Sequence, residues 1–163
     1  PMPDHDTAGL AAKVLTVSDG VVHGTREDRS GAVLVELLTE HGYDVVEQRV
    51  VADGVENVSQ ALIEMSDGFV GAVITTGGTG FGPRDLTPEG TRLVIEREAP
   101  GIAEAMRLVN PLGRLSRAIA GTRGTTLIVN SPGSPKGTVE TVTAVIDVIP
   151  HAVRLMAAAP TDH

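Results

Sequence analysis

The chain has 163 residues, of which 41% are hydrophobic and 21% charged, a balance typical of one globular domain. Its net charge of −8 and its pI of about 5.0 argue against nucleic acid or an anionic membrane as a partner, because both repel an acidic protein. There is no cysteine, which excludes disulfides and thiolate chemistry, and no apolar run approaches the length of a membrane span.

Strand and helix patterns alternate along the first half of the chain. Apolar runs and helical spacing predict, in order, a strand at residues 13–17, a helix at 33–38 that stops at Gly42, a strand at 43–51, a helix at 58–65 and a buried strand at 69–76. The short, nearly continuous apolar runs are typical of strands buried on both faces.

The second half continues the alternation. A helix is predicted from Thr87, read as its N-cap, through Pro88 at the first helical position to about residue 98. Short helices are expected at residues 102–109 and 115–120, a buried strand at 125–130, and a last helix in which Pro150 either bends the helix or begins a new one. The whole pattern predicts a single α/β domain with a mostly parallel central sheet.

The unusual loops all follow predicted strands. Ser18-Asp19 follows the first strand, Asp53 the second, the glycine-rich segment 75–85 the third, and the turn Ser131-Pro132-Gly133-Ser134-Pro135 the last. In parallel sheets, ligands bind beyond the carboxyl ends of the strands. These loops are therefore expected to converge on one ligand site.

The segment Thr76-Gly77-Gly78-Thr79-Gly80 leads into Arg84-Asp85. Glycines let backbone N–H groups approach an oxyanion, and Asp85 could hold a divalent cation against phosphate oxygens. No Gly-Lys-Ser/Thr follows, which excludes a Walker loop, and Pro83 stands where a dinucleotide fingerprint needs its third glycine. The pattern favours phosphate binding over a plain glycine-rich turn.

Asp53 admits two interpretations. Asp53-Gly54-Val55-Glu56 has the form of a capping box, with the aspartate as N-cap and Glu56 reaching back to it. The same carboxylate could instead meet a metal ion or water at the ligand site. The two roles can coexist if one carboxylate oxygen serves each.

A basic stretch interrupts the acidic sequence between Gly101 and Gly124. Its arginines are Arg107, Arg114, Arg117 and Arg123, against the single acid Glu104. The stretch either accepts a small anion or forms a solvated helix face. Five scattered histidines argue against a zinc site, and Ser116 has no histidine neighbour in sequence to suggest a hydrolase triad.

Three blocks of sequence carry a family resemblance. They are Thr16-Val17-Ser18-Asp19 with Gly24, Asp28, Ser30 and Gly31; Thr76-Gly77-Gly78-Thr79-Gly80 with Arg84-Asp85-Leu86-Thr87-Pro88-Glu89; and Leu115-Ser116-Arg117-Ala118 with Gly121 and Leu127-Ile128-Val129-Asn130-Ser131-Pro132-Gly133-Ser134-Pro135. Together they resemble the molybdopterin-binding family, which includes the bacterial molybdopterin adenylyltransferases and the G domain of gephyrin. The resemblance covers residues 12–157, and Gly20 departs from it, because many relatives carry a larger, often basic residue there.

The resemblance implies a three-layer α/β/α fold and the Mg-ATP-dependent adenylylation of molybdopterin, with release of pyrophosphate. By motif position, Asp53 and Asp85 are the expected catalytic carboxylates and the expected ligands of Mg²⁺. The expected substrate-binding residues are Ser18, Asp19, Gly77, Gly78, Thr79, Gly80, Ser116, Arg117, Pro132, Gly133 and Ser134. Two alternatives stay open: a molybdopterin-binding carrier or scaffold without transfer activity, and a binder of sugar or nucleotide phosphates that shares the crevice.

Assembly, location and chain ends complete the expectations. The resemblance implies a homotrimer or, in some relatives, a hexamer. The apolar residues of the last helices are expected to supply the contact surface between subunits (Val139, Val142, Val145, Ile149 and Val153). The first dozen residues show no basic, apolar secretion signal, which favours a cytoplasmic protein. Residues 1–11 and 158–163 are expected to be a flexible leading segment and a tail.

Overall fold

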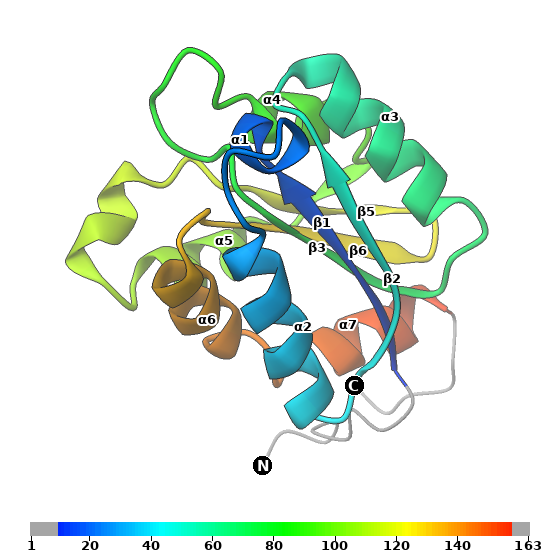
Figure 1. The fold of residues 1–163 in the computed structure, drawn as a ribbon. Helices are drawn as coiled ribbons and strands as arrows, with labels where there is room; N and C mark the ends of the chain where they lie inside the picture. The colour runs from blue at the N-terminus through cyan, green and yellow to red at the C-terminus, as the bar shows by residue number, and fades with distance from the viewer. Residues whose placement is uncertain (1–9, 158–163) are drawn as a thin grey trace.

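A six-stranded sheet forms the centre of the computed structural model, which describes residues 10–157 (Figure 1). The strands are β1 (Ala11–Val17), β2 (Asp44–Val51), β3 (Gly71–Thr76), β4 (Arg97–Glu98), β5 (Ala120–Arg123) and β6 (Thr126–Ser131). Their order across the sheet is β2-β1-β3-β6-β5-β4, and the pairs among β2, β1, β3 and β6 are parallel. Only β5 runs in the opposite direction, antiparallel to both β6 and β4, so the predicted, mostly parallel sheet is confirmed.

Helices cover both faces of this sheet. They are α1 (Asp19–Val22), α2 (Arg29–Glu40), α3 (Val55–Ser66), α4 (Thr87–Arg92), α5 (Pro100–Arg107), η1 (Pro111–Leu115, a 3₁₀ helix), α6 (Pro135–Thr143) and α7 (Ile149–Met156). In Figure 1, α2, α5, α6 and α7 lie on one side of the sheet, and α3 and α4 lie on the other. The three-layer α/β/α architecture is thereby confirmed. No helix within residues 10–157 is long and apolar enough to cross a membrane.

Two separate cores follow from the alternation of side chains along the buried strands. Val14 and Ile74 face the side of α2, α5, α6 and α7, whereas Leu15 and Val73 face α3 and α4. Every residue of β3 is buried, because helices pack on both of its faces. Because β2, β1, β3 and β6 are parallel, they all end at one edge of the sheet, where the loops that follow them meet.

The late helices differ from the expectation that they carry apolar surface. Val142, Val145, Ile149 and Val153 are at most 1% exposed, because they form part of the core under α6 and α7. Their use as an oligomer surface is therefore excluded for these side chains. Pro150 lies in the first turn of α7, so it begins a new helix rather than bending one.

Two predicted helices in the middle of the chain are wrong. The helix expected from Thr87 to residue 98 ends at Arg92, and residues 97–98 form β4. The helix expected at 115–120 is absent: η1 ends at Leu115, residues 116–119 form neither helix nor strand, and β5 begins at Ala120 and pairs with β4 and β6. Strands of two and four residues are too short to show a periodicity, so the pairing of β5 with β6 and of β4 with β5 decides their conformation.

The termini of the domain lie close to the expected positions. β1 begins at Ala11, one residue before the expected start of the domain, and α7 ends at Met156. The remaining residues of the predicted flexible ends, 1–9 and 158–163, lie outside the described part of the chain.

Candidate phosphate-binding cleft

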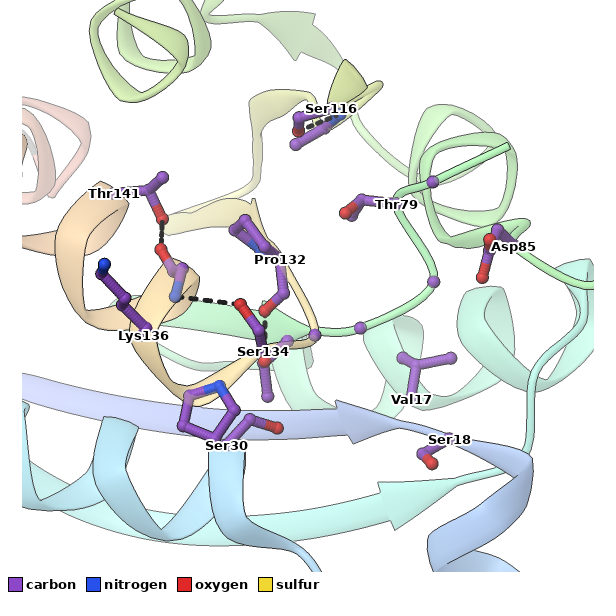
Figure 2. A pocket seen from close by; sticks show the side chains of 18 of the residues that line it. Val17, Ser18, Ser30, Thr79, Asp85, Ser116, Pro132, Ser134, Lys136 and Thr141 are labelled. Carbon is purple, nitrogen blue, oxygen red and sulfur yellow. Dashed lines mark hydrogen bonds between the residues drawn. The ribbon is translucent and has the colours of Figure 1, made fainter. Parts of the chain in front are cut away.

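A cleft of about 890 Å³ opens at the carboxyl edge of the parallel strands. The loops after β1, β2, β3 and β6 all line it, as predicted, together with the segment that follows η1. Figure 2 shows side chains from these loops around one space, including Ser18, Thr79, Ser116 and Ser134. The predicted site residues that line the cleft are Ser18, Asp53, Gly77, Gly78, Thr79, Gly80, Asp85, Ser116, Pro132, Gly133 and Ser134.

The glycine loop after β3 has a conformation that only glycine adopts easily. Gly77 and Gly78 have φ angles of 104° and 70°, in the region that L side chains rarely enter. A Cβ on Gly77 would overlap the carbonyl oxygen of Val17, and one on Gly78 would overlap the hydroxyl of Thr87. Both glycines are therefore required by backbone geometry and by close packing.

The carbonyl oxygens of this loop are all occupied by donors. Those of Gly77 and Gly78 accept from the hydroxyl (2.8 Å) and the backbone N–H (3.0 Å) of Thr87. Those of Thr79 and Gly80 accept from the backbone N–H (2.9 Å) and from Nε (2.7 Å) of Arg117. Thr87 is consequently not the predicted N-cap of α4; Leu86 occupies that position and Thr87 binds the loop instead.

The backbone N–H groups of the same loop are left for a ligand. Within residues 10–157, the N–H groups of Gly78, Thr79 and Gly80 have no hydrogen-bond acceptor. Successive unpaired N–H groups form a nest that binds anions. Residues 78–80, defined here as the nest, lie in the wall of the cleft, where an oxyanion can reach them.

Arg117, predicted to bind substrate, does not line the cleft. Besides Gly80, its guanidinium donates to the backbone oxygen of Asp85 at 2.6 Å and to the carboxylate of Glu89 at 2.7 and 3.3 Å. The ion pair with Glu89 holds the pKa of that carboxyl below its usual range. Arg117 therefore holds the loop from behind rather than pointing a free charge into the cleft.

Asp53 does not cap α3, so the predicted capping box is wrong. The N-cap is Gly54, which makes no side-chain capping bond. Asp53 and Asp19 instead exchange hydrogen bonds: the Asp19 N–H donates to Asp53 Oδ2 (2.9 Å), and the Asp53 N–H donates to Asp19 Oδ1 (3.1 Å). This reciprocal pair joins the ends of β1 and β2 and turns the Asp53 carboxylate toward the cleft.

The carboxylate of Asp19 is already used within the protein. Arg84 donates to both of its oxygens at 3.0 Å and also to the backbone oxygen of Asp53 at 3.0 Å. This pairing lowers the pKa of Asp19. Asp19 does not line the cleft, so the structure places it beside the site as a support of Asp53.

Burial raises the pKa of Asp53, and the nearby charges of Asp19 and Asp85 act in the same direction. The hydrogen bond from the Asp19 N–H and the charge of Arg84 oppose that shift. A half-buried carboxylate among other acids is stabilised when a cation binds beside it. Asp53 is therefore suited to a positively charged ligand.

The carboxylates of Asp53 and Asp85 flank the nest. A Cβ on Gly78 would lie 3.2 Å from Asp53 Oδ1, and one on Gly80 would lie 3.0 Å from Asp85 Oδ2. No cluster of three or more metal-binding side chains occurs in residues 10–157. Mg²⁺ usually takes one or two carboxylates and completes its shell with water and substrate phosphates, so this donor pair fits it.

Three basic side chains that the sequence did not predict for the site also line the cleft. Arg26, Arg29 and Lys136 stand on its rim, and Lys136 is visible beside Ser134 in Figure 2. The sequence around Arg26 and Arg29 is typical of solvated surface charges, and nothing in it marks these two residues as part of a site. Lys136 directly follows the Ser134-Pro135 motif, which is the one signal that could have found it.

Part of the cleft wall is apolar. Met106, Leu112 and Leu115 line it, and Leu112 and Leu115 are 70% and 59% exposed. Of the predicted basic stretch, Arg107 reaches the cleft, and it donates to the backbone oxygen of Ala118 at 2.7 Å. The cleft thus combines an anion-binding nest, two carboxylates, a basic rim and an apolar wall, a composition suited to a phosphorylated ring compound.

Comparison with known proteins gives consistent matches over this domain. Residues 13–151 match the model of a family described as "Probable molybdopterin binding domain". The chain is 40% identical over 150 residues to a molybdopterin adenylyltransferase of Helicobacter pylori, covering 88% of this chain and 85% of that protein. It is 35% identical over 161 residues to gephyrin of Dictyostelium discoideum, covering 90% of this chain but 22% of gephyrin.

A solved structure agrees with these relatives. The crystal structure of the molybdopterin biosynthesis enzyme MoaB from Thermus thermophilus superposes with a TM-score of 0.86. The two are 41% identical, and the match covers 94% of this chain and 99% of the other.

Proposed function

The chain belongs to the family of molybdopterin-binding domains, and from that premise we propose that it is a molybdopterin adenylyltransferase of molybdenum cofactor biosynthesis. The observation that carries this proposal is the nest of free N–H groups between two carboxylates, in a chain 40% identical to a named adenylyltransferase. Its substrates are molybdopterin and ATP, and its products are adenylyl-molybdopterin and pyrophosphate.

The reaction joins two phosphates. An oxygen of the molybdopterin phosphate forms a bond to the α-phosphorus of ATP, and the bond from that phosphorus to the bridging oxygen of the β-phosphate breaks. Pyrophosphate leaves with the electron pair. Such transfers depend on positioning and charge neutralisation more than on a protein nucleophile, which suits a cleft without cysteine or a histidine base.

The nest and the rim supply the positive potential for these anions. The N–H groups of residues 78–80 bind a phosphate without moving, because the carbonyl oxygens of residues 77–80 are already anchored. Arg26, Arg29 and Lys136 draw the negatively charged substrates toward a protein whose net charge is −8. Ser18, Ser116 and the Pro132-Gly133-Ser134 turn line the remainder of the substrate site.

The two carboxylates are the proposed catalytic residues and the proposed ligands of Mg²⁺. Asp53 and Asp85 would hold the ion, and the chemistry that it would supply is neutralisation of phosphate charge and polarisation of the α-phosphorus. Asp19 keeps the backbone and carboxylate of Asp53 in place through their reciprocal hydrogen bonds. Arg84 secures Asp19 in turn, so the support extends from β1 through β2 to the glycine loop.

The test is a pyrophosphate-release assay with molybdopterin and MgATP. We expect release that requires both substrates and Mg²⁺. The alternative is a molybdopterin carrier without transfer activity, for which pyrophosphate would not appear although molybdopterin still raised the melting temperature. A binder of sugar or nucleotide phosphates would show no preference for the pterin in the same melting experiment.

A homo-oligomer, with a trimer favoured over a hexamer, is part of the proposal, as is a cytoplasmic location. The apolar side chains that the fold leaves exposed support assembly; the largest exposures are Phe81 71%, Leu93 71%, Leu108 85%, Leu112 70% and Leu115 59%. Light scattering at micromolar concentration should give a mass of about three chains. A mass near the 16.9 kDa of one chain would contradict the proposed assembly.

A further inference from the structure

Arg117 stands out because its side chain connects the glycine loop to α4 while lying outside the cleft. α4 holds the first part of the loop directly, through Thr87 and the carbonyl oxygens of Gly77 and Gly78. The later part has no such contact with α4. Arg117 holds it instead, through the backbone oxygens of Thr79, Gly80 and Asp85.

Glu89 anchors this arrangement. It lies in the first turn of α4 and accepts from two nitrogens of the Arg117 guanidinium. A guanidinium has donors in a fixed plane, so pairing with Glu89 also sets the direction of the bonds to Gly80 and Asp85. The guanidinium carbon also lies 5.8 Å from the ring centre of Phe81, within the same loop. The orientation of the segment from Gly80 to Asp85 thus depends on one side chain and its partner.

We infer that Arg117, oriented by Glu89, is a positioning residue that fixes the segment from Gly80, the last residue of the nest, to Asp85, and so keeps the carboxylate of Asp85 in its working direction. A peptide unit joins the C=O of one residue to the N–H of the next, and the two point in opposite directions, so a donor to the C=O also fixes that N–H. The backbone N–H of Arg117 holds the Thr79 carbonyl and thereby the Gly80 N–H, whereas its guanidinium holds the carbonyls of Gly80 and Asp85 at the two ends of the segment. The N–H groups of Gly78 and Thr79 are fixed by Thr87, through the carbonyls of Gly77 and Gly78. The inference deepens the proposed function and rests on it for its effect on turnover.

The response to Glu89→Gln distinguishes a positioning role for Arg117 from direct binding of substrate by its charge. If Arg117 bound substrate through a free charge, Glu89→Gln would remove a competing carboxylate and leave substrate binding unchanged or tighter. If Arg117 is a positioning residue, Glu89→Gln releases the guanidinium and disturbs the loop. Arg117→Lys gives a second contrast, because lysine retains the charge but cannot reach several acceptors with a planar fork.

The chain offers a matched control for the lysine substitution. Arg49 is as exposed as Arg117, 31% against 30% for the side chains, and it also pairs with carboxylates, those of Glu47 and Glu64. It lies on β2 and does not line the cleft. Arg49→Lys should therefore leave turnover and ligand binding as in the wild type.

The experiment measures kcat and KM for pyrophosphate release in the wild type, Arg117→Lys, Glu89→Gln, the double variant and Arg49→Lys. We expect kcat to fall about tenfold or more in both single variants, with smaller rises in KM, because the Asp85 carboxylate and the end of the nest are preorganised around charge that grows during transfer. The double variant should be little worse than either single one, since both changes release the same segment. In nitrogen–proton correlation spectra, the amide signals of Gly80, Phe81, Gly82 and Asp85 should shift in both variants.

Two outcomes would overturn the inference. One is an unchanged or raised kcat in Glu89→Gln, which would also decide the matter if Arg117→Lys failed to fold. The other is a lower melting temperature without a change in kcat or in the amide signals. Should the wild type release no pyrophosphate, the proposed function fails instead. Calorimetry with inorganic pyrophosphate in the presence of Mg²⁺ then tests the role of Arg117 separately. We expect about tenfold weaker binding in Arg117→Lys and Glu89→Gln, and unchanged binding in Arg49→Lys.

Discussion

Two neighbouring parts of the cleft use the same hydrogen-bonding groups in opposite ways. At the ends of β1 and β2, the side chains of Asp19 and Asp53 accept from backbone N–H groups, so these N–H groups are consumed inside the protein. In the glycine loop after β3, Thr87 and Arg117 donate to backbone carbonyl oxygens, so the N–H groups remain free.

The difference decides which charge each part can bind. The first part presents carboxylate oxygens and suits a cation, whereas the second presents N–H groups and suits an anion. Because Asp53 and Asp85 lie against the two sides of the nest, a cation and a phosphate can bind in contact with each other.

The largest effect is expected from Asp85→Asn. Asparagine retains the size of the side chain but removes a charge proposed to hold Mg²⁺, while the nest and the rim remain. We expect transfer to fall by roughly a hundredfold or more, the scale of losing one preorganised electrostatic group, with molybdopterin still bound. Pyrophosphate release and a binding titration on one preparation would measure both. Full activity would remove Asp85 from the proposed mechanism.

Asp53→Asn should give a loss of similar or slightly smaller size without loss of stability. The amide oxygen can still accept from the Asp19 N–H, and the substitution removes the charge of a half-buried carboxyl group whose pKa is raised. The melting temperature should therefore stay unchanged or rise while the rate falls. A fall in melting temperature that matched the fall in rate would indicate a structural role alone.

Arg84→Ala should shift the pH dependence rather than abolish activity. Burial already raises the pKa of Asp53, and loss of the Arg84 charge raises it further, so activity should disappear at a higher pH on acidification. The measurement is kcat against pH across the acid range for variant and wild type. Coinciding profiles would show that Asp53 does not control this limb.

The same variant has a predictable effect on stability. The hydrogen bond from Arg84 lowers the pKa of Asp19, so the pair stabilises the fold above the ordinary carboxyl pKa, and this is lost as pH falls through the lowered value. The difference in unfolding free energy between wild type and variant should therefore vanish in acid. Urea titrations at several pH values would detect it.

The smallest effect is expected from Tyr43→Phe, at the opposite edge of the sheet. Tyr43 is 3% exposed and donates to the backbone oxygen of Ile146 at 2.6 Å. Its loss should cost about 1 kcal/mol of unfolding free energy in urea titrations, with kcat unchanged. A changed kcat would mean that the two edges of the sheet are coupled.

Much of the fold could be predicted because its signals are local. The buried strands, α2 and α3 follow from apolar spacing within a few residues, and the meeting of the loops follows from parallel strands ending at one edge. β4 and β5 could not be predicted this way, because they are held by pairing across the sheet. The capping box predicted at Asp53 is absent for a related reason: a capping box is a local pattern, but the Asp53 carboxylate accepts from the backbone N–H of Asp19 instead.

The sequence by itself determined that this chain forms an α/β domain with a glycine loop fit for phosphate, since glycine and buried strands act through neighbouring residues. Only the tertiary structure decided the roles of Asp19 and Arg117, whose partners Asp53 and Gly80 lie 34 and 37 positions away in the chain. The physical reason is that a polar or charged side chain forms hydrogen bonds with the groups that the fold brings close to it. These distances between segments far apart in the chain are absent from any local sequence pattern.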